Sequence, residues 1–438
     1  MTTGLARASV RARPAAFTGV FAVLVLSATV VTSSVAMLRT ASALPASEAR
    51  EDLTTMGMGF TLVTVYLAIF VIAQVMALAV AQRARENAVL RAVGALPWQI
   101  RRMVATEALL TSLLALPAGY ALGWTLSHVW CGGMTGHGLL PEGTRPTVGV
   151  VPALVAAAVL LVTSQLGGLL AAQRAARARP MEALGQAAAP RRGVTVARAV
   201  RGVAAALAFA GATALTALTA AGPREDVGEH LPLVLLAHLV AVGLAGPALG
   251  RLSAALVAVP LRLLGDGAPS ELALSHHRVH AGRLSSAVTP VALVVAFTLV
   301  KLAALSAAGD PSYVDLFATL LYAVFAALVA ANTLVMLTVE RRPAVTLLRS
   351  LGAGGGQILR MFLVDAFLVA AAGFGSGLLV AAAVTLPLGD AAGAPLGALD
   401  GSAWAGTGLG VLALTLLATL APVLRAPSPG LTTGPARA

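Results

Sequence analysis

Long apolar runs, separated by short polar segments, follow one another along the whole chain. A helix needs about 20 mostly apolar residues to cross the hydrocarbon core of a bilayer. Ten runs meet this length, and the fifth is rich in Ala and Thr. We predict membrane-spanning helices at 17–37, 57–80, 103–127, 149–171, 202–221, 231–250, 287–308, 316–339, 361–388 and 404–424.

Arginine residues alternate with these runs and give the chain an orientation. If the N-terminus is cytoplasmic, the outer segments contain only Arg39, Arg50, Arg145 and Arg224, and most of the acidic residues lie outside. Basic residues favour cytoplasmic loops. We therefore expect a multi-pass protein of the plasma membrane with both termini in the cytoplasm. The first run could also be a signal peptide, because a basic start precedes it and Ala41-Ser42-Ala43 follows it.

Composition agrees with the pattern of runs. Hydrophobic residues make up 58% of the chain and charged residues 11%, with a mean hydropathy of +0.87. Soluble domains have about 25% charged residues, which excludes a soluble or a disordered protein. The fold class we predict is an all-α integral membrane protein. The formal net charge of +12 favours contact with the bilayer surface, and we expect no nucleic-acid partner. The single cysteine, Cys131, excludes an intrachain disulfide.

One segment of the chain repeats at an offset of 258 residues. Identical residues fall at the same places in both copies: Leu90 and Leu348, Arg91 and Arg349, Gly94 and Gly352, Gln99 and Gln357, Arg102 and Arg360, and Met103 and Met361. The first run aligns loosely with the seventh at an offset near 270. Corresponding spans are six apart, an even number, so the two copies have the same orientation in the membrane and form a parallel repeat.

The repeat divides the chain into three parts. We predict a first half at 1–184 with its core at 57–184, and a second half at 265–438 with its core at 316–425. Between them, 185–264 would form a two-span insert and an interfacial helix.

The repeated segment contains a bend that we call an elbow. A helix continues beyond the second span, and Gly94 and Pro97 then interrupt it, because both residues disfavour a helix interior. A helix–turn–helix at the membrane surface could dock a cytoplasmic partner, or could be an ordinary basic loop beside anionic lipid headgroups. Two matching copies favour docking. The candidate residues are Arg83, Glu86, Arg91, Gly94, Gln99, Arg102, Arg341, Arg349, Gly352, Gln357 and Arg360.

Two further pairs of positions are equivalent in the repeat. Glu107 and Asp365 lie about one turn inside the bilayer, where acids are costly. We expect them to pair with Arg101, Arg102 or Arg360 and so to fix the elbows. Small residues recur at every fourth position and predict close helix packing: Ala115, Gly119 and Gly123 in the first half align with Gly373, Gly377 and Ala381 in the second. We expect no metal site, although His276 and His280 would share a helix face.

The elbow sequence resembles the FtsX-like permease domain of ABC transporters, the MacB/FtsX/LolC group. The residues that carry the resemblance are Arg-Glu-x-x-x-Leu-Arg-Ala-Val-Gly-Ala at 85–95, then Gln99-Ile100 and Glu107. The layout is similar to ten-span BceB-like permeases, which implies that the elbows bind an ATPase subunit. Two departures are clear. Ala344 and Pro343 replace Glu86 and Arg85 in the second copy, and the outer loops leave no room for a large extracytoplasmic domain.

The resemblance implies a permease subunit rather than an enzyme. A Walker site needs Gly-Lys-Ser/Thr, and the single lysine, Lys301, lies in an apolar run. We therefore expect no cofactor on this chain, with ATP and Mg²⁺ bound by two copies of a cytoplasmic ABC ATPase. A second permease chain is a further possible partner.

Three functions remain open at this point. The first is export or extraction of an amphiphilic, lipid-like, antibiotic or peptide substrate. The second is a non-transporting regulator that transmits movement to a partner in the membrane or cell envelope. The third, an ion-coupled carrier, is disfavoured because charges are scarce at the membrane midplane.

Overall fold

The computed structural model describes residues 14–46, 48–177, 196–223, 281–308, 313–392 and 399–424, with short stretches between 230 and 245. Over these residues the chain is helical and contains no strand. Nine of the described helices are long and apolar enough to cross a membrane. The predicted all-α membrane fold is therefore confirmed.

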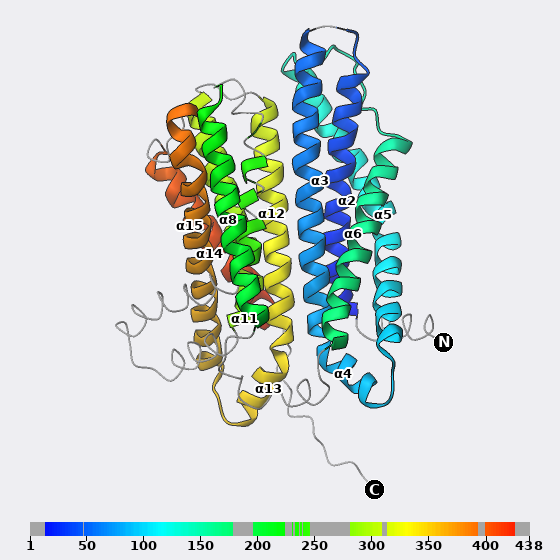
Figure 1. Ribbon diagram of the computed structural model, residues 1–438, viewed down its shortest axis with the longest axis vertical. Coiled ribbons are helices and arrows are strands. Elements are labelled where there is room, and N and C mark those ends of the chain that lie inside the picture. Colours follow the sequence, from blue (N-terminus) through cyan, green and yellow to red (C-terminus); the bar gives the residue numbers. More distant parts are fainter. Residues whose placement is uncertain are drawn as a thin grey trace.

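Two bundles of helices stand side by side (Figure 1). The first contains α2 (Pro14–Ser42), α3 (Glu48–Gln82), α4 (Ala84–Ala92), α5 (Pro97–Gly136) and α6 (Val150–Arg177). The second contains α11 (Ala281–Ala308), α12 (Tyr313–Glu340), α13 (Arg342–Ser350), α14 (Gly355–Ala392) and α15 (Gly401–Leu424), with α8 (Val196–Ala221) packed on α14. The short helices α4 and α13 lie at the same end of the molecule, as a parallel repeat requires.

The insert between the halves is only partly described. Its first span is α8, whereas the predicted span at 231–250 lies partly outside the described residues, which show a short apolar helix at Leu233–Ala245. In that helix Gly243 lies against Phe70 of α3, and Val242 packs with Ala292 of α11. The insert thus contacts both halves. The predicted interfacial helix, and His276 and His280 with it, fall outside the described residues.

Each bundle is built around one central helix. The most apolar part of α2 is 83% buried and that of α11 is 72% buried, whereas the other spans range from 22% to 56%. Within its bundle, α2 packs against α3, α5 and α6, and α11 packs against α12, α14 and α15. The charged residues of these helices, Arg39 in α2 and Arg283 and Lys301 in α11, lie toward the helix ends, so an apolar stretch of each helix can be surrounded on all sides.

Glycines let the central helices approach their neighbours closely. A Cβ at Gly119 would lie 2.8 Å from the carbonyl oxygen of Val25 in α2, and a Cβ at Gly377 would lie 2.7 Å from that of Ala292 in α11. Gly123 and Gly373 make similar contacts with α2 and α11. Because Val25 corresponds to Ala292, the offset between these two helices is 267 residues, a little less than the sequence alignment gave.

The halves meet where α12 contacts α2, α3 and α5. The hydroxyl of Tyr322 donates a hydrogen bond of 2.8 Å to the carbonyl oxygen of Phe60, and lies 3.1 Å from the hydroxyl of Thr64. Its ring also contacts the rings of Phe60 and Phe297, with centroids 5.2 Å apart in each case. Thr64 and Tyr322 are 258 residues apart and are therefore equivalent in the repeat. Their contact marks the pseudo-twofold axis between the halves.

Candidate functional site

The first elbow is closed by a glycine in a left-handed conformation. After α4 ends, Gly94 has φ of 105°, a region that L-residues rarely adopt. Its N–H donates to the carbonyl of Arg91 at 3.0 Å, and the N–H of Ala95 donates to the carbonyl of Leu90 at 2.9 Å. These two bonds form a Schellman motif, which satisfies carbonyls left unpaired at a helix end.

The second elbow has the same backbone geometry. Gly352 has φ of 91°, and its N–H donates to the carbonyl of Arg349 at 3.0 Å. The N–H of Ala353 donates to the carbonyl of Leu348, also at 3.0 Å. Pro343 lies in the first turn of α13, where its missing N–H has no intrahelical partner to lose. The replacement of Arg85 by proline therefore leaves the elbow intact.

Glutamine side chains cap the helices that follow. The Oε1 atom of Gln99 accepts a hydrogen bond of 2.9 Å from the N–H of Leu96, at the start of α5. Gln357 accepts the equivalent bond from Gly354 at 3.1 Å, at the start of α14. This is the glutamine half of a capping box, and it sets the angle at which the chain enters the next helix.

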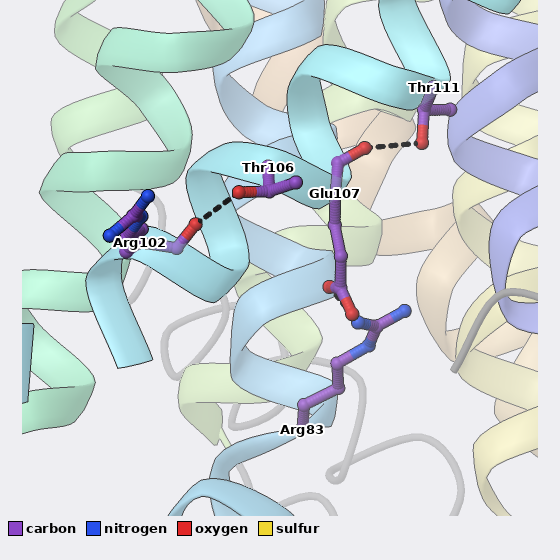
Figure 2. A network of polar contacts seen from close by, with 5 residues as sticks. All are labelled: Arg83, Arg102, Thr106, Glu107 and Thr111. Carbon is purple, nitrogen blue, oxygen red and sulfur yellow. Dashed lines mark hydrogen bonds and ion pairs between the residues drawn. The ribbon is translucent and has the colours of Figure 1, made fainter. Parts of the chain in front are cut away.

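Two ion pairs, each between a buried acid and a partly exposed arginine, connect the helices on either side of the elbows. Arg83, after the last turn of α3, pairs with Glu107 of α5, and Arg341, after the last turn of α12, pairs with Asp365 of α14. The acid side chains are only 7% and 6% exposed. Figure 2 shows the Arg83 guanidinium directed at the Glu107 carboxylate, and the hydroxyl of Thr111 donating to the Glu107 carbonyl oxygen at 2.8 Å.

The expected arginine partners of these acids were wrong. Arg102 and Arg360 are exposed, and Figure 2 shows Arg102 pointing away from Glu107. The two residues are five positions apart on one helix, which places them on different faces. A signal for the observed pairing was present in the sequence, because Arg83 and Arg341 repeat at the same offset as Glu107 and Asp365.

Exposed apolar side chains gather at the tips of both elbows, a feature that sequence reasoning missed. Val93 is 84% exposed and its repeat equivalent Leu351 is 76% exposed. One turn earlier, Val89 and Leu347 are also exposed, at 47% and 61%. We call these four residues the apolar tips. Arg349 and Glu86 are exposed beside them, and Arg91 is half-buried.

Each elbow thus has an anchored base and a free apolar tip. The base is held by an ion pair with a buried acid and by the capped start of a long helix, whereas the tip projects from the end of the bundle. Such an arrangement can transmit a displacement of the elbow into α3 and α5, or into α12 and α14.

The architecture defines a multi-pass membrane protein with two parallel helical repeats, each bearing a surface elbow. Comparison with protein families assigns the chain more closely: the family described as FtsX-like permease C-terminal matches residues 58–180 and 316–428, more than half of the chain. The chain belongs to the FtsX-like permease family. A search of curated proteins found no significant match.

Membership in this family places the chain among the membrane subunits of ABC transporters, in the plasma membrane. Such subunits are generally not catalytic themselves, and they generally work with a cytoplasmic ABC ATPase. The two matched regions contain both elbows and both ion pairs.

Proposed function

We propose that this chain couples ATP hydrolysis by a separate cytoplasmic ATPase to the export or extraction of an amphiphilic substrate. The observation that carries the proposal is the matched pair of elbows, with equal cap geometry, equivalent ion pairs and apolar tips at one end of the bundle. Two equivalent docking elements suit two copies of one ATPase chain. ATP and Mg²⁺ would be bound on that partner.

The direction of force transmission follows from the bases of the elbows. An ATPase that binds at Val93 and Leu351 would move α4 and α13 as levers. Because Arg83 joins α3 to α5, and Arg341 joins α12 to α14, each lever displaces two spans together. The spans α3 and α12 contact each other at Tyr322, so a displacement of either elbow would be transmitted to the contact between the two halves.

An amphiphilic substrate fits the short outer connections. Only five residues separate α2 from α3 and four separate α11 from α12, so no aqueous binding domain stands between these helices. A substrate would then be taken from the bilayer itself.

The second candidate function is a regulator that transmits the movement of the elbows to a membrane partner. The rings of His137 in the first half and Tyr313 in the second stack with centroids 4.5 Å apart. This contact joins the two halves at the end opposite the elbows, where a regulator would pass movement to its partner.

Co-purification tests the docking role. The chain is expressed with each candidate ABC ATPase of its source genome, extracted in mild detergent and assayed for ATP hydrolysis in the captured complex. We expect Val93→Asp combined with Leu351→Asp, and likewise Arg91→Glu combined with Arg349→Glu, to release the ATPase. A matched control, Glu142→Arg with Asp400→Arg, changes two exposed charges at the opposite end and should retain it.

Two results would overturn the docking role: no ATPase binds the wild-type chain, or the control variants release it as fully as the elbow variants do. Once a complex is captured, the two candidate functions separate on cargo. Reconstituted complex that moves a labelled amphiphile between leaflets is a transporter, whereas ATP hydrolysis without movement favours the regulator.

A further inference from the structure

A small cavity lies beneath the first elbow, among the inner ends of α2, α3, α4 and α5. Its volume is about 30 Å³, which is room for about two water molecules at 10–15 Å³ each. Its lining is partly polar and includes Arg83 and Glu107 of the ion pair, Asn87 of α4, Thr111 of α5, and the apolar side chains of Met76 and Val104. The Arg83 side chain, which lines the cavity, is 18% exposed.

Asn87 points to what the cavity contains. The residue is 3% exposed, and its Nδ2 atom has no hydrogen-bond partner among the described residues. A buried amide without a partner is costly, and buried polar groups are nearly always satisfied by protein or by ordered water. A donor on a residue that lines a cavity of this size requires a small acceptor, and water meets that requirement.

The second half keeps the ion pair but differs at several of the other lining positions. The residues at 258 positions further on are Val345 for Asn87, Phe362 for Val104, Leu334 for Met76 and Val369 for Thr111. Phe362 is 1% exposed and is among the largest fully buried side chains in the described chain. Larger or apolar side chains therefore stand at these four positions beside the equivalent pair of Arg341 and Asp365.

We propose that the cavity is a hydration site, in which one or two water molecules bound to Asn87 reach the ion pair of Arg83 and Glu107. The equivalent pair in the second half has Val345 in place of Asn87, so no amide holds water beside it, although the Arg341 side chain is 27% exposed. The site makes the first elbow the more readily opened of the two. This mechanical consequence rests on the proposed function, whereas the hydration itself does not.

The physical basis is the competition that water provides. An ion pair in a dry, low-dielectric interior is strong because neither charge has another partner. A bound water offers a hydrogen bond to each charge as the two separate, so less free energy is lost when the pair opens. The first elbow can then yield to a pull at Val93 while the second holds.

X-ray hydroxyl-radical footprinting of the full chain in detergent tests the proposal without any ATPase. Radicals formed from bound water oxidise nearby methionine to the sulfoxide, which mass spectrometry counts. Met76 lines the cavity and is only 5% exposed. We expect several-fold faster oxidation of Met76 than of Met134, which is 3% exposed and lines an apolar cavity.

Two variants make the comparison specific. Asn87→Val installs the residue of the second half and should slow Met76 oxidation to the rate of Met134. Leu334→Met places the same probe in the second half, where we expect slow oxidation because no amide holds water there. The second variant keeps the test decisive if the first fails to fold.

The proposal is overturned if Met76 is oxidised no faster than Met134, if Asn87→Val leaves its rate unchanged, or if the methionine introduced by Leu334→Met reacts as fast as Met76. None of these outcomes depends on ATPase binding, so a failure of hydration and a failure of the coupling role are distinguishable.

Discussion

The two halves share a backbone framework and differ in what fills it. Both elbows end in a left-handed glycine, both following helices start at a glutamine cap, and both bases are held by an ion pair with a buried acid. Beside the first pair lies a cavity lined partly by Asn87, and beside the second Phe362 replaces Val104 of that lining. The geometry that a docking partner would meet is thus common to both repeats, whereas the interior that resists its pull is not.

This difference suggests a division of labour. If both elbows received the same stroke from two identical ATPase chains, identical interiors would produce a symmetric movement of the bundles. If water reaches the ion pair at the base of the first elbow and not that of the second, the two bundles would move by unequal amounts. The first half would then move against a second half that acts as the fixed support.

Removal of the arginines should give the largest and most unequal effects. We expect Arg341→Ala to lower the free energy of unfolding by about 3–5 kcal/mol, because it removes the arginine from the buried Asp365 carboxylate. Arg83→Ala should lower the free energy of unfolding clearly less, since water in the cavity can solvate Glu107. Denaturant or thermal unfolding of both variants in one detergent measures the difference.

Arg102→Ala and Arg360→Ala are the controls for this prediction, because both side chains are exposed and neither is the partner of the buried acid. They should change stability by less than about 0.5 kcal/mol. A loss for Arg83→Ala equal to that for Arg341→Ala would show that the two bases are equally dry.

Adding a methyl group at the close helix contacts should lower the free energy of unfolding by about 1–3 kcal/mol, and by the same amount in both halves. Gly119→Ala places a methyl group against Ala28 and the backbone of α2, and Gly377→Ala places one against Val295 and the backbone of α11. Gly375→Ala, on the same helix but facing open space, should be neutral or stabilising. Melting temperatures compare the three. Unequal falls in melting temperature for Gly119→Ala and Gly377→Ala would show that the two halves share their backbone geometry at the elbows but not in the packing of their spans.

Sequence reasoning recovered the features that depend on local chemistry. Apolar run length predicted the nine spans that the described residues contain, small residues at every fourth position predicted close packing of α5 and α14 against a neighbour that the sequence did not name, and Gly94 with Gly352 predicted the bends. These features follow from side-chain size and backbone freedom at the position itself, so a single sequence carries them.

What sequence reasoning missed depends on how distant segments come together. The partners of Glu107 and Asp365 follow from the approach of α3 to α5 and of α12 to α14, which no local rule supplies. The apolar tips at Val93 and Leu351 needed the exposure of each side chain. Asn87 attracted no attention because it has no counterpart in the repeat, and a search for matching pairs discards what is unique to one copy.

The left-handed glycines should contribute equally to both halves. Gly94→Ala and Gly352→Ala each force a Cβ into a conformation that costs about 1–2 kcal/mol for an L-residue. We expect similar falls in melting temperature, and a reduced yield of captured ATPase because the tips shift. Gly354→Ala, which has no positive φ, serves as the control. Unchanged capture with both glycines replaced would show that tip position is not important for docking.

The smallest effects, at the glutamine caps, should again be unequal, for a different reason. Loss of the cap costs about 0.5–1 kcal/mol in general. Before Gln99 the chain has Pro97, which presets the first turn of α5, whereas Gly354, Gly355 and Gly356 precede Gln357 and favour the unfolded chain. Gln357→Ala should therefore destabilise more than Gln99→Ala. Hydrogen exchange at the first turns of α5 and α14 resolves so small a difference. Faster exchange in Gln99→Ala than in Gln357→Ala would show that Pro97 does not hold the first turn, and that the first elbow is loose at its cap as well as at its base.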